Sequence, residues 1–189
     1  APEVIRTSPE NKSVNFNHTT IEIEFNEYIE LQNFGNQFYA SPPLTSKITQ
    51  KLKGKKLILT LNEELLPNTT YTFNFGNSIT DITERNVQSD FKYVFSTGPY
   101  LDSLTVKGQV VDAFTGLPEA GLIALLHPYN LSDSGILSEK PTYYAISNEE
   151  GNFSIENLAL DTFQLFAVKD QNFDLTYTHG AEKYAFAEH

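Results

Sequence analysis

The chain has 189 residues, of which 40% are hydrophobic and 20% charged, a globular composition that argues against wholesale disorder. It contains no Cys, which excludes disulfides, thiolate zinc sites, iron–sulfur clusters and cysteine nucleophiles. It also contains no Met, so we expect a processed or trimmed piece of a longer protein. The net charge of −11 is concentrated in residues 99–189, which carry 4 basic and 13 acidic side chains. This half would repel a phosphate backbone, so no nucleic-acid partner is expected.

Short segments in which apolar and polar residues alternate run through the whole chain. A period of two is typical of half-buried strands, and Thr, Tyr, Phe and Ile are common in these segments. No window keeps apolar residues at helical spacing over three turns, so only one short helical turn is expected, at Glu63–Leu66, stopped by Pro67. The alternation predicts strands at 21–25, 57–61, 71–75, 93–95, 106–110 and 163–168.

Turn residues separate these segments, and Lys53–Lys55 is predicted to form the tip of a hairpin. Many short strands with Gly, Pro and Asn between them favour an all-β fold of two tandem β-sandwiches, because about 95 residues is a typical sandwich size. The boundary is expected at Ser96–Pro99, where Gly-Pro ends a strand and the charge balance changes. The predicted domains are residues 1–98 and 102–180, with 181–189 as the truncated start of a following segment.

Five motifs in the first half follow one another in a recognisable order. They are Ser8–Asn11, Ile21–Ile29, Gly54–Leu57, Leu66–Phe73 and Tyr93–Thr97. Together these motifs resemble the bacterial Ig-like domain of the S-layer-associated type, and the resemblance covers most of residues 2–98. It implies an Ig-like β-sandwich.

The second half carries a different set of motifs: Val106–Asp112, Leu122–Leu126, Ala145–Phe153 and Phe163–Val168. This set resembles the carboxypeptidase-regulatory-like domain, over about residues 103–175. The resemblance implies a transthyretin-like (prealbumin-like) seven-stranded sandwich. Two residues depart from the family pattern, because Asp161 stands where the family usually has Gly and Phe163 replaces its Tyr.

The two resemblances together point to a family of Gram-negative cell-surface lipoproteins that contain an Ig-like domain. They imply an exported, non-catalytic structural or spacer module of the cell envelope, at the outer-membrane surface or in the periplasm. Membrane contact is expected only through an anchor outside this chain. The resemblance supplies no catalytic residues, and the sequence shows no nucleophile elbow, phosphate loop or zinc-type histidine pair, so no enzyme activity is expected.

Oxygen-bearing side chains alternate at Asp170, Asn172 and Asp174, which is how calcium loops surround a hard cation. The carbonyl of Thr176 and the carboxylate of Glu182 would complete such a site. Leu175 occupies the position that needs Gly in an EF-hand, and Glu182 comes one residue late. The alternative is a solvated turn after the strand at 163–168. Calcium is the single cofactor candidate.

Three further features bear on function, and the first two are each open to two interpretations. Five lysines lie within Lys47–Lys56, and they serve either to contact an anionic surface or to protect a sheet edge. The long loop at 128–141 is either a binding loop for a glycan or cell-surface protein, or a variable insertion. Tyr143 and Tyr144 are adjacent, so they point to opposite faces of a strand and one of them is expected to be exposed.

Overall fold

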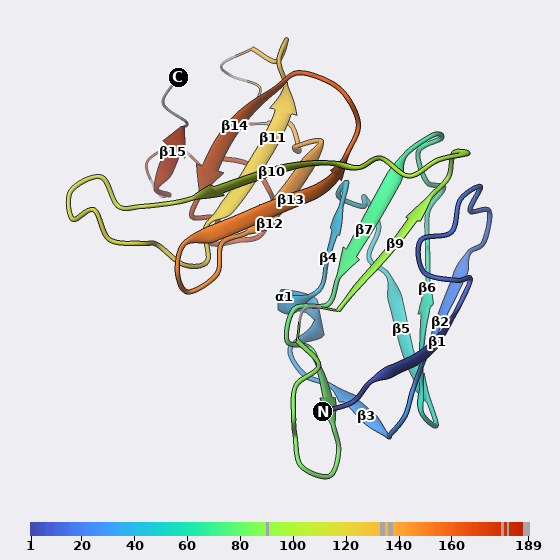
Figure 1. The fold of residues 1–189 in the computed structure, drawn as a ribbon. Coiled ribbons are helices and arrows are strands. Elements are labelled where there is room, and N and C mark those ends of the chain that lie inside the picture. Colours follow the sequence, from blue (N-terminus) through green and yellow to red (C-terminus); the bar gives the residue numbers. More distant parts are fainter. Residues whose placement is uncertain (90, 133–134, 136–137, 179, 181, 187–189) are drawn as a thin grey trace. The chain divides into compact units, whose positions relative to one another are not determined.

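The computed structural model describes residues 1–89, 91–132, 135, 138–178, 180 and 182–186, and the regular secondary structure of this part is almost entirely β-strand (Figure 1). The predicted all-β fold class is confirmed. The chain divides into two compact units, one of residues 1–40 and 44–101 and the other of residues 41–43 and 102–189. Each unit contains a hydrophobic cluster of its own.

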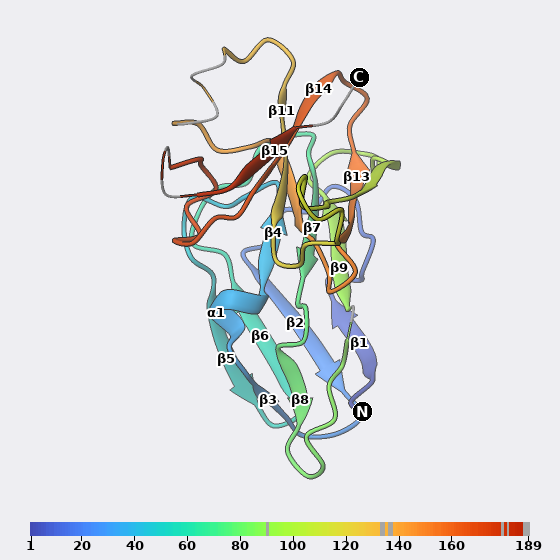
Figure 2. The same ribbon diagram turned by 90° about the vertical axis from the view of Figure 1, so that its left-hand side faces the viewer.

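The first unit contains a four-stranded sheet in the order β1-β2-β6-β5, a three-stranded sheet β4-β7-β9 and a two-stranded sheet β3-β8. Figure 2 shows the strands of the four-stranded sheet side by side. The elements are β1 (Val4–Ser8), β2 (Thr20–Phe25), β3 (Ile29–Leu31), α1 (Phe34–Gln37), β4 (Tyr39–Ser41), β5 (Thr49–Lys53), β6 (Lys56–Thr60), β7 (Thr70–Asn74), β8 (Ile79–Asp81) and β9 (Lys92–Ser96).

The predicted period of two explains which side chains form the core of the first unit. Ile21 and Ile23 on β2 are fully buried and lie opposite Leu59 and Leu57 on β6. The ring of Phe95 on β9 packs against four other aromatic rings at centroid distances of 4.1 to 5.8 Å. This aromatic contact joins the strands of the core, because large rings bury much apolar area and prefer tilted and edge-to-face packing.

The predicted helical turn at Glu63–Leu66 is wrong. The Glu63 carboxylate instead accepts hydrogen bonds from Thr45 N–H (3.1 Å), Thr45 Oγ1 (2.8 Å) and Ser46 N–H, which ties this segment to a distant loop. A helical turn forms at α1 instead, after Asn33 in the left-handed region at φ 48°. A four-residue helix has too few residues for a helical pattern to be visible in the sequence.

The second unit contains a two-stranded sheet β10-β13 and a four-stranded sheet in the order β12-β11-β14-β15. Its hydrophobic cluster includes Leu122, Ala124 and Leu126 from the β11 segment, together with Phe153 and Ile155 from β13. Residues 184–186, within the stretch predicted to begin a following segment, pair antiparallel with β14. The strands are β10 (Leu104–Gln109), β11 (Ile123–Pro128), β12 (Tyr143–Ile146), β13 (Asn152–Leu158), β14 (Phe163–Val168) and β15 (Tyr184–Phe186).

No helix in the described residues is long and apolar enough to cross a membrane.

Candidate functional sites

The residues predicted to bind calcium lie in the loop that follows β14. Asp170 is buried, and its Oδ1 accepts hydrogen bonds from the N–H groups of Asn172 (3.1 Å) and Phe173 (2.7 Å). Its Oδ2 accepts a hydrogen bond from the N–H of Leu175 at 2.8 Å. Phe173 and Leu175 both have positive φ values, of 58° and 65°. The Asp170 carboxylate therefore holds a turn whose backbone is unfavourable for side chains of this kind.

The other predicted ligands are also engaged within this loop. Asp174 Oδ2 accepts a hydrogen bond from Asn172 Nδ2 (2.8 Å), and Oδ1 accepts from Thr176 N–H (2.8 Å) and Oγ1 (2.6 Å). The Glu182 carboxylate accepts hydrogen bonds from the backbone N–H groups of Gln171 and Thr178, at 2.9 Å each. The described residues contain no group of three or more His, Asp or Glu side chains arranged to hold a metal. The calcium site stays a prediction.

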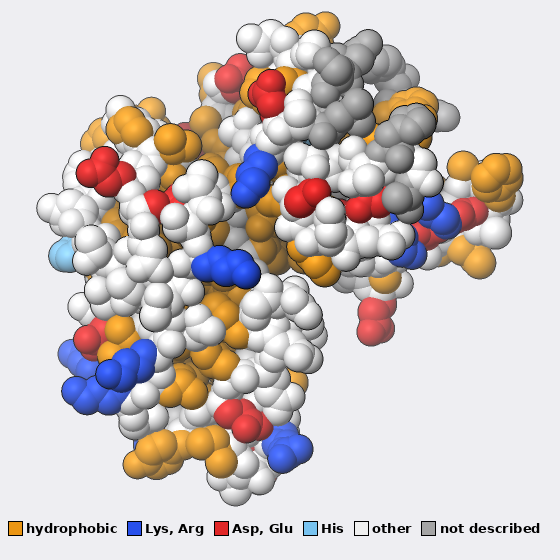
Figure 3. Space-filling model, turned by 180° about the vertical axis from the view of Figure 1, so that it is seen from behind, with side chains coloured by type: hydrophobic (Ala, Val, Ile, Leu, Met, Phe, Trp, Pro, Cys, Tyr) orange, Lys and Arg blue, Asp and Glu red, His pale blue; other side chains and the backbone are white. Residues whose placement is uncertain are grey.

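The lysine-rich segment forms the β5–β6 hairpin, and Figure 3 shows basic side chains gathered over this sheet. Lys51 and Lys53 lie on β5, an edge strand whose five residues are all exposed. Lys53 lies opposite Lys56, which contacts Glu22 at 3.1 Å. This position on a sheet edge is the one that the edge-protection interpretation requires. The alternative, that these lysines contact an anionic surface, stays a prediction.

Two of the four histidines, His18 and His127, belong to the described residues, whereas His179 and His189 lie outside them. His127 on β11 is fully buried, with its ring 6.1 Å from that of Phe166. Within the described residues, neither ring nitrogen of His127 has a hydrogen-bond partner. Burial lowers the pKa of the imidazole, because the protein interior disfavours its charged form.

The loop at 128–141 begins beside β14, where Gln164 Nε2 donates hydrogen bonds to the carbonyl oxygens of Tyr129 (2.6 Å) and Leu131 (3.2 Å). The Tyr129 side chain is 68% exposed. Residues 133–134 and 136–137 of this loop lie outside the described part of the chain.

The expected exposure of Tyr143 or Tyr144 is wrong, because both side chains are buried. Their strand, β12, pairs with β11, on which neighbouring residues that point to opposite faces are also buried, such as Ala124 and Leu125. A strand covered on both faces hides adjacent side chains equally.

Sequence reasoning missed an ion-pair cluster in the second unit. Lys183 Nζ lies 2.7 Å from Glu119 Oε1 and 3.3 Å from Asp112 Oδ2. Hydrogen bonds from the N–H groups of Thr115 and Phe114, together with Lys183, hold the pKa of Asp112 well below its usual range. Glu119 and Asp112 in turn raise the pKa of Lys183. The sequence around Asp112 contains a local signal for a turn. Nothing in the sequence, however, indicates that Asp112 would contact Lys183, which lies 71 residues away.

The same turn presents an apolar tip to solvent. Phe114 is 99% exposed, and Leu117 and Val111 are 64% and 46% exposed. Figure 3 shows hydrophobic side chains on this protruding loop, beside acidic and basic ones. A fully exposed phenyl ring on an ordered turn is unusual, because burying it would release much apolar surface from water.

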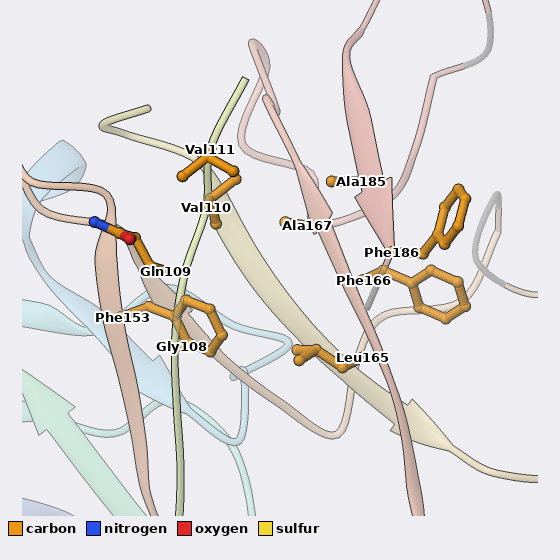
Figure 4. Close-up of a pocket in the computed structure, with 10 residues that line it drawn as sticks. All are labelled: Gly108, Gln109, Val110, Val111, Phe153, Leu165, Phe166, Ala167, Ala185 and Phe186. Carbon is orange, nitrogen blue, oxygen red and sulfur yellow. The ribbon is translucent and has the colours of Figure 1, made fainter. Parts of the chain in front are cut away.

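An apolar pocket of about 280 Å³ opens beside this turn, within the second unit. Figure 4 shows Val110 and Val111 on one side of it and Leu165 and Ala167 on the other. Gly108 contributes bare backbone, against which the Phe153 ring packs so closely that a Cβ on Gly108 would lie 2.7 Å from ring atoms. Gln109 supplies the one polar side chain of the lining, which is completed by Phe166, Ala185 and Phe186.

Comparison with known protein families finds one match, to the model described as a bacterial Ig-like domain, over residues 1–97. No curated protein matches the chain.

Among solved structures, the chain is similar to the N-terminal part of the bacterial S-layer protein SbsC, at 13% identity and a TM-score of 0.34, covering 100% of this chain and 44% of that one. It is similar to the major pilin subunit BcpA of Bacillus cereus at 12% identity and a TM-score of 0.27, covering 100% of this chain and 64% of that one. The T6 backbone pilin of Streptococcus pyogenes matches at 10% identity and a TM-score of 0.28, covering 89% of this chain and 46% of the pilin. At TM-scores this low, these likenesses transfer neither an arrangement nor an activity to this chain.

Proposed function

Because the chain belongs to the family of bacterial Ig-like domains, by the match over residues 1–97, we propose that it is a non-catalytic structural module that spaces parts of an exported cell-envelope protein. Ig-like sandwiches serve many functions, so the family alone does not fix the role.

The observation that carries this proposal is that the chain forms two compact β-units, each with a hydrophobic cluster of its own, the second taking only residues 41–43 from the first half of the chain. Only residues 97–103 separate β9 of the first unit from β10 of the second. A unit that buries its own core can keep its fold without help from a ligand or a neighbour, and antiparallel strands resist separation through many backbone hydrogen bonds. These are the properties that a spacer needs.

The proposal extends to the second unit and to location. The motifs between residues 106 and 168 support a transthyretin-like sandwich of the carboxypeptidase-regulatory-like type. The pairing of both resemblances in one chain supports a Gram-negative lipoprotein, held at the outer-membrane surface or in the periplasm by an anchor outside this chain.

Small-angle X-ray scattering of the chain tests the spacer role. We expect an elongated particle with two lobes. A flexible Gly-Ser insertion after Gly98 should increase the maximum dimension while leaving the melting of both units unchanged. A single compact particle, or loss of stability in either unit on insertion, would contradict a spacer. Protease treatment of intact source cells, followed by detection of the chain, tests its exposure at the cell surface.

The second candidate function is adhesion through the loop at 128–141, which the exposed Tyr129 ring favours. Binding to a glycan array and to isolated cell-surface proteins would be compared between the wild type, Tyr129→Ala and the control Leu160→Ala. Leu160 is 90% exposed and lies between β13 and β14. Adhesion through this loop requires that Tyr129→Ala alone loses binding.

A further inference from the structure

We propose that the second unit forms a weak two-fold dimer in which Phe114 of each copy inserts into the apolar pocket beside Val111 of the other copy. This self-association goes beyond the spacer role. It rests on three features of the second unit: an exposed phenyl ring on a hydrogen-bonded turn, a pocket of suitable size, and the closeness of the two on one surface.

Hydrogen bonds hold the backbone of the turn that carries Phe114. Asp112 Oδ1 accepts hydrogen bonds from Phe114 N–H (3.0 Å), Thr115 N–H (2.9 Å) and Thr115 Oγ1 (3.1 Å). Gly116 N–H donates to Asp112 O at 2.8 Å, with Gly116 in the left-handed region at φ 68°. Lys183 fixes the second carboxylate oxygen of Asp112 from β15's side of the unit. The backbone of the turn is therefore already ordered, so binding costs little further backbone freedom, which favours association.

The pocket has room for the ring. An apolar cavity of about 150 Å³ is enough to hold a benzene molecule, and this pocket has a volume of about 280 Å³. Its walls come from Val110, Leu165 and Ala167, whose side chains are apolar, so they match a phenyl ring and not a charged group.

The protruding ring and the pocket lie next to each other, because Val111 both begins the turn and lines the pocket. A surface that places a projection beside a matching hollow is self-complementary under a two-fold axis, and two-fold dimers are the commonest protein oligomers. Two inserted rings with Leu117 and Val111 around them would bury on the order of 1,000 Å² in total, which is the lower end for specific interfaces. We therefore expect a weak dimer that forms only at high protein concentration.

The net charge of the two copies opposes this contact, so its driving force is the burial of apolar groups. Each copy carries a net charge of −11, so two copies repel one another at low ionic strength. The carboxylates nearest the tip, Asp112 and Glu119, already contact Lys183. An apolar contact between like-charged copies becomes stronger when salt screens their repulsion.

Sedimentation velocity over a range of protein concentrations tests the proposal. We expect dimerisation that is tighter in 300 mM than in 20 mM sodium chloride. Phe114→Ala should raise the dissociation constant by at least about thirtyfold, the effect of losing a binding hot spot. The exposed control Leu160→Ala should change it by less than about twofold. A monomer at all concentrations, or a Phe114→Ala variant that dimerises like the wild type, would overturn the proposal.

A mixing experiment distinguishes reciprocal insertion of Phe114 from non-specific hydrophobic association. Ala185→Leu, at the half-buried position of edge strand β15 that lines the pocket, fills the hollow but keeps Phe114. Phe114→Ala keeps the hollow but lacks the ring. Neither variant should dimerise alone, whereas their mixture should form a heterodimer with one insertion, weaker than the wild type. Circular dichroism confirms that both variants are folded, and a mixture that stays monomeric would overturn reciprocal insertion.

Discussion

Asp112 and Lys183 form a 3.3 Å ion pair although 71 residues separate them in the chain. The contact joins the turn after β10 to the segment that leads into β15. Since β15 is a three-residue edge strand whose pairing partner is β14, this side-chain contact adds a second attachment at its start.

Lys183→Met should therefore loosen β15 without unfolding the second unit. We expect faster hydrogen exchange of the backbone amides of Tyr184–Phe186, while the amides of β11 keep their protection, because local opening needs few contacts to be lost. Lys169→Met is the control, since Lys169 lies 3.9 Å from Glu119 and, within the described residues, forms no ion pair with Asp112. Equal exchange of β15 in Lys183→Met and the wild type would show that the ion pair does not hold this strand.

Asp81 should make the first unit sensitive to acid. Hydrogen bonds from the N–H groups of Glu84, Asn86 and Arg85 lower its pKa from an ordinary value near 3.8. A carboxylate whose pKa is lowered by folding stabilises the native state above its unfolded pKa, and this contribution is lost as pH falls below about 4. Melting curves between pH 6 and pH 2.5 should show a smaller decline in Asp81→Asn than in the wild type. The exposed control Glu64→Gln should retain the wild-type decline.

His127 should give the second unit a separate pH dependence. Burial lowers its folded pKa below the ordinary 6.5, so its stability contribution is complete above pH 6.5 and falls as pH drops below that value. His127→Phe should remove this decline between pH 6.5 and pH 5. It should also stabilise the second unit by about 1–2 kcal/mol, because a buried polar group without a partner is costly. Urea titrations measure both effects, and His18→Phe, at an exposed position, is the control.

Asp170→Ala should destabilise the second unit by about 2–3 kcal/mol, because three backbone N–H groups lose their acceptor. Calorimetry with millimolar calcium and with a chelator distinguishes this structural role from metal binding. We expect the same loss under both conditions. A calcium-dependent rise in the melting temperature that Asp170→Ala abolishes would establish the predicted site at Asp170, Asn172 and Asp174.

Replacing Lys51 and Lys53 by Val should increase aggregation of the native protein. These lysines lie on the exposed edge strand β5, whose free backbone groups are open to pairing with another chain. Light scattering over time should show faster growth for the double variant than for Lys47→Val, a lysine just outside the strand. Unchanged scattering would favour the anionic-contact interpretation of this segment.

The sequence alone was enough to predict the all-β class and much of the first unit. Ile21–Phe25 and Tyr71–Phe75 alternate with a period of two, and this pattern is local, so it can be seen without a structure. The hairpin at Lys53–Lys55 follows from the same local signals. The turns held by the Asp81 and Asp170 carboxylates also depend on local contacts, because each donor N–H lies within five residues of its acceptor, although the sequence analysis assigned Asp170 to a calcium site instead.

Only the tertiary structure decided which groups meet across long distances. The ion pair of Asp112 with Lys183 and the pocket between β10 and β14 depend on how strands from distant parts of the chain are brought together. The same is true of burial on both faces of β12, which hides Tyr143 and Tyr144 together, and of Glu63, whose carboxylate binds a distant loop in place of starting a helix. Periodicity reports the face of a strand on which a side chain lies, whereas the strand that covers that face is selected by the packing of the whole unit.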